Sequence, residues 1–592
     1  MQQFIQTVLA EIEYQPVRLI EALRRCQTHF HYIPRECIDQ FAAVLLIPRT
    51  QIIAVIEFYS FLHLKPQGHY EILISDSITD HMLGQKSLLD YLAKQLKIQP
   101  GQLRQDGRVS LGLTSCTGLC DQGPAALING HAIAQLSIKK IDQLVLFIEQ
   151  NLPMSQWPSE WFCVADNLRR EDLLLSQPIT AGQGLQSAWD RGFDQTLETI
   201  EKSGLRGRGG AGFKTALKWR FCAETVSERR YVVCNADEGE PGTFKDRVLL
   251  SRFADQVFEG MTVCAAIIGA SQGFLYLRGE YVYLYEALQK VLVNRRAQGL
   301  LGDNILAGGV HFDIEIRLGA GAYICGEESA LIESLEGKPG IPRNRPPYPV
   351  TSGYLNQPTV VNNVETFMAA AAIAAYGAEW FSAQGTRQSA GTKILSISGD
   401  CERPGVYEYP FGISIAQILK DCGADDVLGV QVGGPSGTFI TAEESHRLLA
   451  YEDLASGGSF IVFNTSRSIF QIVKNFTDFF AHESCGFCTP CRVGTSLLQK
   501  QLDKIVLGHG SAGDVVELEM IAGLLRQYSH CGLGQTAANP VLTTLERYPE
   551  LYQQQLKNIS YEPGFDLDAA LQVARQMAGR NDAAAHLQQV ED

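Results

Sequence analysis

Four cysteines near the C-terminal end of the chain have the spacing of a metal-cluster site. Cys485, Cys488 and Cys491 share the run ESCGFCTPCR, and Cys531 follows in SHCGLGQTAANP. Thiolates spaced in this way can converge on one small inorganic cluster, and the remote fourth cysteine completes the all-thiolate shell that holds a 4Fe-4S cubane. Structural zinc is the alternative, but four-cysteine zinc sites usually pair two separate C-x2-C knuckles. We therefore expect an iron-sulfur cluster and single-electron transfer.

The elements that position these cysteines follow from the hydrophobic pattern. From Ile469 onward the pattern is helical up to the cysteine set, and before it two strands and a helix form a β-grasp-like module. Upstream, glycine-rich turns alternate with buried strands such as YVVCNA and GFLYLRGEY, which is typical of an α/β nucleotide-type domain. We expect an N-terminal helical segment (1–64), a small α/β domain (65–150), a Pro- and Trp-rich linker (151–184), the nucleotide-type domain (185–388), the β-grasp domain (389–468), the helical cysteine domain (469–560) and a helical tail (561–592).

Composition and charge exclude several classes of function. The 592 residues are 45% hydrophobic and 19% charged, with a formal net charge of −15. Nucleic acid is excluded as a partner, because phosphate binding needs clustered Lys and Arg. The most apolar run, Phe367 to Tyr376, is too short for a membrane span. The N-terminus has no basic start and no cleavage site, so we expect a cytoplasmic protein.

A glycine-rich motif opens a helical segment in the nucleotide-type domain. SGLRGRGGAGFKTALKW contains Gly207, Gly209, Gly210 and Gly212. Such a loop presents backbone N–H groups to a phosphate, and the missing side chains let a planar ring come close. Glycine-rich turns also occur for plain backbone reasons, so the glycines alone leave a nucleotide site undecided.

Acidic motifs strengthen the case for a nucleotide site. NADEGEPGTFKDR places Asp237, Glu238, Glu240 and Asp246 at the end of an apolar strand, where carboxylates can accept hydrogen bonds from ribose hydroxyls. A solvated acidic turn is the alternative. Two further motifs supply hydrogen-bonding side chains of this kind. They are a second acid pair, Glu327 and Glu328 in GEESALIESLEG, and two amides, Asn362 and Asn363 in PTVVNNVET.

Five motifs in this order, GRGGAGF, NADEGEPGTFKDR, GAYICGEESALIESLEG, PTVVNNVET and ESCGFCTPCR, resemble the flavin-bearing NADH-oxidising subunit of respiratory complex I and its relatives. The match runs from about Gly182 to Tyr552. The resemblance implies a multidomain α/β and α fold with a Rossmann-like FMN and NADH domain, a β-grasp domain and a C-terminal helical bundle that carries the iron-sulfur cluster.

The resemblance also assigns cofactor-binding residues by position, with no catalytic acid or base of the protein's own. Lys218 is expected near the flavin or the dinucleotide phosphates. Phe213, Phe221 and Tyr348 are expected to stack on the dinucleotide, and Glu238, Glu240 and Glu328 to surround its ribose and carboxamide. The residues expected to hold FMN are Gly207, Arg208, Gly209, Gly210, Gly212, Phe213, Asn235, Asp237, Glu327, Asn362 and Asn363.

The cofactors imply the reaction: reversible hydride transfer between NAD(H) and FMN, then single-electron transfer through one 4Fe-4S cluster. The protein would supply orientation rather than acid-base chemistry. Glu240 and Glu328 would repel a 2′-phosphate, so we expect NAD(H) rather than NADP(H).

The N-terminal region resembles the small thioredoxin-like ferredoxin subunit that accompanies the flavin subunit. In that family a 2Fe-2S cluster uses two pairs of cysteines. Cys116 and Cys120 match the second pair, but Ser75 and Asp80 stand at the first. Soft thiolates hold such clusters, so we expect a degenerate domain without a 2Fe-2S cluster, kept for packing and assembly. Ligation through Ser75, Asp80 or the neighbouring His81 is the alternative.

Fusion of the two subunits in one chain is not the usual complex I arrangement, and CGLGQTAANP looks more like soluble hydrogenase and formate dehydrogenase relatives. The resemblance therefore implies the large diaphorase subunit of a cytoplasmic NAD-reducing nickel-iron hydrogenase, in a heteromeric complex with a small iron-sulfur subunit and the nickel-iron subunits. The NADH-handling subunit of a formate dehydrogenase, a complex I subunit and a non-catalytic scaffold remain as alternatives.

Overall fold

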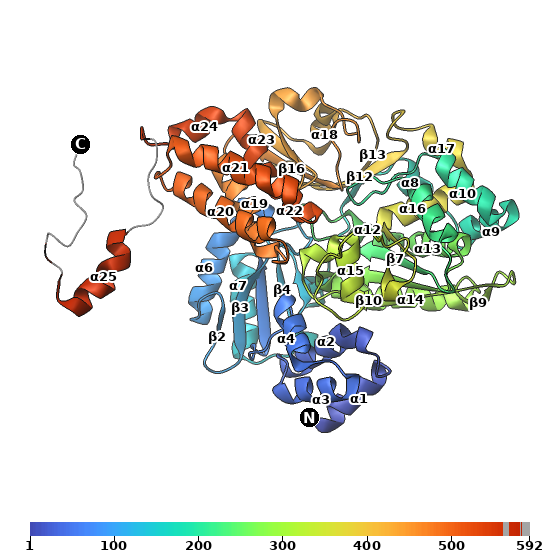
Figure 1. Cartoon of the computed structure of the whole chain (residues 1–592), viewed down its shortest axis with the longest axis horizontal. Coiled ribbons are helices and arrows are strands. Elements are labelled where there is room, and N and C mark those ends of the chain that lie inside the picture. The colour runs from blue at the N-terminus through green and yellow to red at the C-terminus, as the bar shows by residue number, and fades with distance from the viewer. Residues whose placement is uncertain (560–566, 581, 583–592) are drawn as a thin grey trace.

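The computed structural model describes residues 1–559, 567–580 and 582. The chain begins with four helices, seen at the bottom of Figure 1: α1 (Gln2–Glu11), α2 (Leu19–Phe30), α3 (Arg35–Leu45) and α4 (Arg49–Phe58). In α2, Leu19, Leu23 and Cys26 recur at helical spacing and are buried. They belong to a core that includes Tyr231 and Phe274 from the nucleotide-type domain. The N-terminal helices therefore cover that domain rather than forming a separate body.

The first sheet is the thioredoxin-like one and has the order β2-β3-β1-β4-β5 (Figure 1). Its central strand β1 runs parallel to β3 and antiparallel to β4. Trp157 and Trp161, from the segment expected to be a linker, are buried in this domain's core. The elements are β1 (Tyr70–Ser75), α5 (Ile78–Met82), α6 (Gln85–Leu96), β2 (Gln102–Leu103), β3 (Val109–Thr114), β4 (Ala126–Ile128), β5 (His131–Ile133) and α7 (Ile138–Glu149).

The second sheet, order β11-β7-β8-β10-β9, lies in the nucleotide-type domain. Strands β7, β8, β10 and β11 are parallel, so their carboxyl ends meet at one edge. Asn235 at the end of β7 pairs in register with Asn363 of β11 and with Tyr276 of β8. In an open parallel sheet this edge is where ligands bind.

Helices cover both faces of this sheet, with α13 and α16 packed into the core of one face (Figure 1). The strands are β7 (Tyr231–Ala236), β8 (Gln272–Leu277), β9 (Gly302–Ile305), β10 (Val310–Leu318) and β11 (Thr359–Asn363). The helices are α8 (Leu173–Ser176), α9 (Gln183–Arg191), α10 (Phe193–Lys202), α11 (Thr215–Glu224), α12 (Lys245–Arg252), α13 (Ala254–Ile268), α14 (Tyr285–Ala297), α15 (Glu328–Leu335), α16 (Val364–Tyr376) and α17 (Ala378–Ser382).

The third sheet is mixed and has the order β15-β14-β16-β12-β13-β6. Its edge strand β6 (Leu168–Arg170) comes from the segment expected to be a linker and pairs in parallel with β13. That segment therefore ties the first domain to the third. The other elements are β12 (Thr392–Gly399), β13 (Gly405–Pro410), α18 (Ile415–Cys422), β14 (Val427–Val432), β15 (Thr438–Thr441) and β16 (Ser459–Asn464).

The C-terminal part is helical, and its core, which contains Phe476, Leu498 and Leu525, continues into the third sheet through Phe439 and Phe463. The helices are α19 (Ile469–Glu483), α20 (Thr489–Val506), α21 (Ala512–Tyr528), α22 (Gly532–Thr536), α23 (Asn539–Arg547), α24 (Pro549–Gln554) and α25 (Leu567–Ala578). Helix α25 stands apart from the body in Figure 1, and residues 561–566, 581 and 583–592 of the expected tail lie outside the described residues. No helix in the described ranges is long and apolar enough to cross a membrane.

Candidate functional site

The glycine-rich loop lies between α10 and α11 and is held as a narrow turn. The Gly207 amide donates to the Phe213 carbonyl at 2.8 Å. Gly212 has φ +64, and a Cβ there would lie 2.4 Å from the Tyr451 ring. The Tyr451 hydroxyl donates to the Gly207 carbonyl at 2.7 Å. Glycine is therefore required where the loop presses against the third domain.

The same loop reaches the carboxyl edge of the second sheet. A Cβ at Gly209 would lie 3.1 Å from Cβ of Asn363. Gly210 has φ +145 and open space beside it. The structure thus brings bare backbone over the end of β11, where a flat or phosphorylated ligand can approach without meeting side chains.

The Arg208 side chain points away from this open space. It is 1% exposed, its amide donates to Thr366 Oγ1 at 2.9 Å, and its Nη2 donates to the Ala390 carbonyl at 2.8 Å. Its guanidinium also lies over the Phe411 ring, 4.8 Å from the centroid. In this structure Arg208 fastens the loop to the third domain.

Asn235 and Asn362 are fixed at the ends of neighbouring strands. Asn235 Nδ2 donates to the Gly326 carbonyl at 2.8 Å, and Asn362 Oδ1 accepts from Trp219 Nε1 at 2.9 Å. Asn235 Oδ1 also accepts from the Asp237 amide at 3.0 Å, so both side-chain amides are held in fixed orientations.

Asn363 is held by a buried ion network. Its Nδ2 donates to Asp246 Oδ2 at 2.6 Å, and its Oδ1 accepts from Lys245 Nζ at 3.3 Å. Lys245 also pairs with Glu365 at 3.0 Å, and Glu365 pairs with Lys393 at 2.5 Å. Burial lowers the pKa of Lys393 to about 7, whereas the pKa of Lys245 is raised because Asp246 and Glu365 outweigh its burial. The network therefore fixes the orientation of the Asn363 side-chain amide.

The three acids of the NADEGE motif have different surroundings. Glu238 accepts from the amides of Asp246 at 2.7 Å and Arg247 at 3.2 Å, at the start of α12. Burial raises its pKa to about 7. Glu240 accepts from the Ser436 amide at 2.8 Å and from the Tyr323 hydroxyl, which joins the second and third domains. Glu238 and Glu240 therefore already carry structural hydrogen bonds.

Asp237 has a buried Oδ2 without a hydrogen-bond partner among the described residues. Burial raises the pKa of its carboxyl well above the ordinary value, and the charges of Glu280 and Glu483 add to this. A buried polar atom without a partner costs free energy unless a ligand or water satisfies it. Asp237 is thus poised for a hydrogen-bond donor from a ligand.

The second acid pair lies at the start of α15. Glu327 caps this helix by accepting from the amides of Ser329 and Ala330, each at 3.0 Å, and pairs with Arg345 at 3.3 Å. Glu328 pairs with Lys218 of α11 at 2.7 Å. Lys218 also donates to the Val361 carbonyl at 3.0 Å, so it reaches the sheet between α11 and α15.

Three aromatic side chains of the site are unusually exposed for their size. Phe213 is 49%, Phe221 is 43% and Tyr348 is 54% exposed. They come from the glycine loop, from α11 and from the segment after α15. Exposed aromatic rings at a site suit stacking on a planar ligand.

Thr215 is a polar residue that the sequence motifs did not single out. It stands in the first turn of α11, directly after the glycine loop, and its buried Oγ1 has no partner in the described part of the chain. A hydroxyl in the first turn after a glycine-rich loop was the available signal, since phosphate loops use this arrangement.

The four cysteines gather where three helices begin or end. Cys485 follows α19, Cys488 precedes α20, Cys491 lies in the first turn of α20, and Cys531 precedes α22. Burial, with the charges of the other three thiols, raises the pKa of Cys491 to about 12. Nearby positive charge is needed to hold such thiols as thiolates.

Zinc and an iron-sulfur cluster place different demands on four thiols. Among the residues that the structure covers, no group of three or more His, Cys, Asp or Glu side chains is arranged to hold one metal ion. Zinc needs four sulfurs about 2.3 Å from one centre. In a 4Fe-4S cluster, by contrast, each of four cysteine sulfurs binds a different iron.

The cysteine set adjoins the acid turn at the carboxyl edge. Burial raises the pKa of Cys531 to about 11, and the charge of Glu327 contributes to this shift. The His530 ring nitrogen Nε2 lies 3.0 Å from the Arg343 carbonyl, two residues before the Arg345 that pairs with Glu327. The structure thus places the thiols beside the acid turn that contains Glu327.

In the thioredoxin-like domain, Ser75 and Asp80 stand at two of the four positions where the family has cluster cysteines. Both side chains are buried and hydrogen-bonded to each other. Asp80 is 1% exposed and accepts from the hydroxyls of Ser75 at 2.5 Å and Ser77 at 2.6 Å. The sulfurs of Cys116 and Cys120 lie 3.5 Å apart. His81 turns outward and pairs with Asp76 at 2.7 Å.

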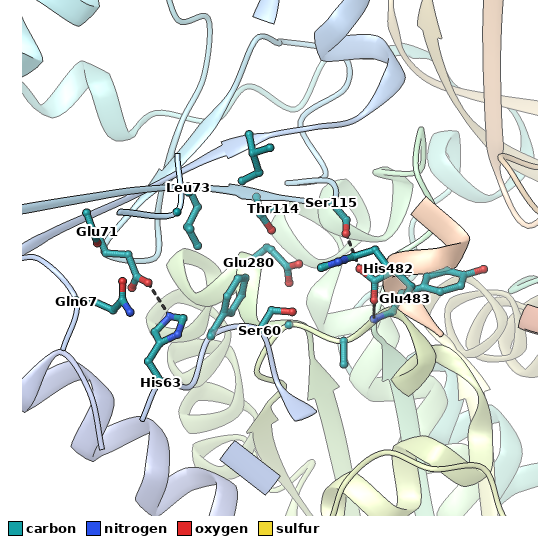
Figure 2. Close-up of a pocket in the computed structure, with 18 of the residues that line it drawn as sticks. Ser60, His63, Gln67, Glu71, Leu73, Thr114, Ser115, Glu280, His482 and Glu483 are labelled. Carbon is teal, nitrogen blue, oxygen red and sulfur yellow. Dashed lines mark hydrogen bonds and ion pairs between the residues drawn. The ribbon is translucent and has the colours of Figure 1, made fainter. Parts of the chain in front are cut away.

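A cavity of about 500 Å³ separates the thioredoxin-like domain from the second sheet and α19 (Figure 2). Glu71 pairs with His63 at 2.8 Å on one side of it. On the other side Glu483 accepts from Ser115 Oγ at 2.5 Å and from the Tyr323 amide at 3.1 Å. The remaining lining includes Asp237, Arg278, Glu280 and His482.

Comparison with known families matches three parts of the chain. The Nuo51 FMN-binding domain matches residues 200–372, the thioredoxin-like [2Fe-2S] ferredoxin matches residues 5–148, and the iron-sulfur binding region of NADH-ubiquinone oxidoreductase-F matches residues 471–555.

Curated relatives extend this similarity. The NAD-reducing hydrogenase HoxS subunit alpha of Cupriavidus necator is 42% identical over 96% of this chain and 97% of its own length. The NADP-reducing hydrogenase subunit HndC of Solidesulfovibrio fructosivorans is 41% identical over 61% of this chain and 75% of its own. An NADH-quinone oxidoreductase subunit of Streptomyces coelicolor is 40% identical over 63% and 86%, respectively.

Solved structures match at full length. A crystal structure of an NAD+-reducing [NiFe]-hydrogenase in the H2-reduced state contains a chain that is 43% identical, with a TM-score of 0.91, over 97% of this chain and 99% of that chain. The air-oxidized state gives a TM-score of 0.87 over 95% and 98%.

Proposed function

Since this chain belongs to the family of alpha subunits of NAD-reducing hydrogenases, we propose that it is the NADH-handling diaphorase subunit of such a complex. FMN supplies hydride exchange with NAD(H) and single-electron release to a 4Fe-4S cluster. The chain itself binds, orients and shields these groups. The observation that supports the proposal is that the cysteine set lies against the acid turn of Glu327, which follows the parallel sheet that also carries Asn235 and Asn363 at its carboxyl edge.

The residues of the sheet edge fit FMN. The backbone of Gly209 and Gly210 leaves open space that a side chain would fill, and Asp237 Oδ2 lacks a partner within the described residues. We propose that the loop amides and Thr215 hold the phosphate and that Asp237 accepts from a polar hydrogen of the flavin or ribityl chain. Asn235, Glu327, Asn362 and Asn363 would complete the site, while Arg208 positions the loop.

The exposed aromatic rings and the acids fit NAD(H). We propose that Phe213, Phe221 and Tyr348 stack on its planar groups. Lys218 is neutralised by Glu328 and so supplies little free positive charge for a 2′-phosphate. We therefore propose NAD(H) over NADP(H), which steady-state comparison of NADH and NADPH tests directly; equal kcat/KM values would contradict it.

The thiol donor set fits a 4Fe-4S cluster. Cys485, Cys488, Cys491 and Cys531 supply four soft ligands, and the first turn of α20 adds N–H groups and a helix dipole that stabilise thiolate. The chain would thereby keep the cluster close to the flavin edge and pass electrons onward to a partner.

We propose a finer fold assignment on the same basis. Residues 185–388 would be the Rossmann-like domain, 389–468 the β-grasp domain and 469–560 the iron-sulfur helical domain. The parallel second sheet and the mixed third sheet support the first two. The pairing of β6 with β13 assigns part of 151–184 to the third domain.

Partners follow from the family. We propose a small iron-sulfur diaphorase subunit and nickel-iron hydrogenase subunits as the heteromeric context. Relatives from quinone-linked complexes match only about two thirds of this chain, whereas the hydrogenase subunit matches 96%. The formate dehydrogenase context is therefore the second choice. All fifteen cysteines lie in the described ranges and none forms a disulfide, which supports a cytoplasmic location.

We further propose that the thioredoxin-like domain holds no 2Fe-2S cluster. Two of the four ligand positions are Ser75 and Asp80, which bond to each other within the protein, and His81 pairs outward with Asp76. A carboxylate and a hydroxyl are hard ligands that suit a binuclear cluster poorly. The family's cluster therefore does not fit the residues present, and the domain would serve packing and assembly.

Restoring thiols at the two substituted positions tests this assignment. Ser75→Cys combined with Asp80→Cys should add about two irons per chain and a binuclear resonance signal after reconstitution, because four thiolates would again surround the site. Ser77→Cys, on the same loop but outside the ligand pattern, is the matched control. Two binuclear irons already present in the unaltered chain would contradict the assignment.

The buried Asp80 makes the stability of this domain depend on pH. Burial raises its pKa to about 6 from the ordinary 3.8. The folded state therefore binds the proton more tightly, so this contribution is full at low pH and is lost as the pH rises through about 6. Relative to Asp80→Asn, we expect the opening free energy of β1, from hydrogen exchange, to fall by about 2 kcal/mol between about pH 4 and pH 7. A difference between the two proteins that is independent of pH would contradict this.

The direct test of the proposed function is NADH oxidation by the purified chain with an artificial dye. We expect dye reduction with NADH by the isolated chain, and hydrogen oxidation only when the nickel-iron partners are added. A chain that retains its fold yet binds no flavin would support a scaffold instead.

A further inference from the structure

Two thiols in the thioredoxin-like domain face each other without a role in the proposed electron path. Cys116 Sγ and Cys120 Sγ lie 3.5 Å apart, with exposures of 2% and 4%. A disulfide needs about 2.05 Å, so the sulfurs must approach by roughly 1.5 Å. Residues 115–125 form neither helix nor strand, so a small backbone shift there breaks no regular hydrogen-bond ladder.

The surroundings of the two sulfurs differ. The Gly118 amide donates to Cys116 Sγ at 3.4 Å. Arg278 Nη2 donates to the Cys116 carbonyl at 2.7 Å, which places its guanidinium charge beside this residue. An amide donor and a neighbouring cation favour thiolate, the nucleophilic form. Cys116 is therefore the attacking thiol and Cys120 the resolving one.

The cavity of Figure 2 ends next to the chain segment that contains this pair. Thr114 and Ser115, which directly precede Cys116, line it together with Arg278. Its volume of about 500 Å³ admits small polar molecules next to the Cys116 backbone. The Cys116 sulfur itself is buried, so a peroxide reaches it only when the neighbouring side chains move.

We propose that Cys116 and Cys120 form a reversible dithiol-disulfide site whose oxidant is a small hydroperoxide. The Cys116 thiolate attacks one peroxide oxygen, which breaks the O–O bond, gives a sulfenic acid and releases the other oxygen as water. The Cys120 thiol then attacks that sulfur and displaces its hydroxyl as a second water. In sum two thiols lose two electrons and two protons, and hydrogen peroxide gains both. A dithiol reductant reverses the reaction.

The pair is coupled to the acid motif of the second sheet. Arg278 joins the Cys116 carbonyl to the Glu238 carbonyl, to which Nη1 donates at 2.6 Å. A Cβ at Gly118 would lie 2.2 Å from the Tyr281 hydroxyl, which itself donates to Glu238 at 2.9 Å. Closing the disulfide moves residues 116–120 against both contacts. Oxidation of the two thiols would therefore change the contacts that hold the NADEGE loop.

The chemical part is tested by peptide mapping of the full chain. The reduced chain is treated with hydrogen peroxide, alkylated and digested with trypsin; the peptide Val109–Lys139 holds these two cysteines and no other. We expect loss of both alkylation sites and a peptide two hydrogens lighter, restored by a dithiol reductant. Cys120→Ser should instead stop at a sulfenic acid that dimedone traps. The exposed Cys163, replaced by Ser, is the control.

Two results would overturn the site: both cysteines of the unaltered chain remaining alkylatable under peroxide, or oxidation going directly to sulfinic acid. This readout needs neither flavin nor NADH, so it stands apart from the proposed function. The predicted effect on NADH binding rests on the proposed diaphorase function. Oxidation should raise the KM for NADH by at least about fivefold with little change in kcat. An unchanged KM in a chain whose disulfide is mapped would reject the coupling to Glu238.

Discussion

Replacing Cys531 by alanine should remove the iron-sulfur cluster and leave the flavin reaction in place. Cys531 is the one ligand that lies outside the run of three, it is 5% exposed, and it stands at the start of α22 beside Glu327. Without its thiolate one iron lacks a protein ligand, and the cluster is expected to decay from about four irons to less than about one per chain. The residue that closes the shell therefore decides whether electrons can leave the flavin singly.

The functional consequences of this substitution separate two steps. NADH-dependent reduction of a two-electron dye should persist, because the sheet edge and its loop are untouched. Hydrogen-dependent NAD+ reduction in the assembled complex should fall by at least about a hundredfold. Iron analysis and both assays check this, with the surface cysteine variant Cys163→Ser as the control. Full hydrogen-dependent activity in the Cys531 variant would contradict the assigned electron path.

Replacing Gly212 by valine should abolish flavin binding. Gly212 has φ +64, which a β-branched residue adopts only at a cost of about 1–3 kcal/mol. In addition, the new Cβ would lie 2.4 Å from the Tyr451 ring, so either the loop or Tyr451 must move. The movement would break the Tyr451 bond to the Gly207 carbonyl and pull the loop off the end of β11. We expect loss of FMN and of NADH-dye activity together.

The matched control is a glycine at which an added Cβ would contact no other atom. A Cβ at Gly523 in α21 has no neighbour within 4 Å, and this helical position carries no positive φ. Gly523→Ala should therefore retain FMN and gain up to about 1 kcal/mol of helix stability. FMN released on denaturation, measured by its fluorescence, checks both variants. Normal FMN content in Gly212→Val would contradict the proposed cradle.

The sequence predictions for the site rest on short motifs, and their assignment to FMN, NAD(H) and the cluster stays a prediction. The positive φ of Gly212 and the exposed rings of Phe213 and Phe221 agree with a glycine loop and stacking surfaces. The hydrophobic pattern from Ile469 onward predicted a helical region up to the cysteine set, and α19 (Ile469–Glu483) occupies this place. The spacing of hydrophobic residues, the backbone freedom of a glycine and the chemical type of a ligand all depend on residues that are adjacent in the sequence. Expectations that use these properties need no knowledge of distant contacts.

Other roles could not be predicted because their partners are distant in the chain. Arg208 turns inward because Thr366 and Ala390 offer it bonds from elements more than 150 residues away. Glu238 caps α12, which its motif alone does not reveal. Strand β6 has only three residues, too few for a periodic pattern, and it is a strand only because β13 pairs with it.

The contact between the NADEGE motif and the N-terminal domain could not be predicted from the sequence either. Arg278 receives no emphasis from any motif, yet it bonds to Cys116, Glu238 and Glu280 at once. Such a buried guanidinium links three elements because its five donors fit several acceptors. The thioredoxin-like domain thereby contacts the NADEGE loop, which we propose as part of the coenzyme site.

Counting iron, sulfide and FMN in the purified chain, with low-temperature paramagnetic resonance after NADH reduction, tests the central claim most directly. We predict about one FMN and about four irons with four sulfides, and a single cubane signal that NADH elicits. About six irons with an added binuclear signal would contradict the cluster-free N-terminal domain. A colourless chain, or one holding zinc at Cys485, Cys488, Cys491 and Cys531, would contradict the diaphorase assignment.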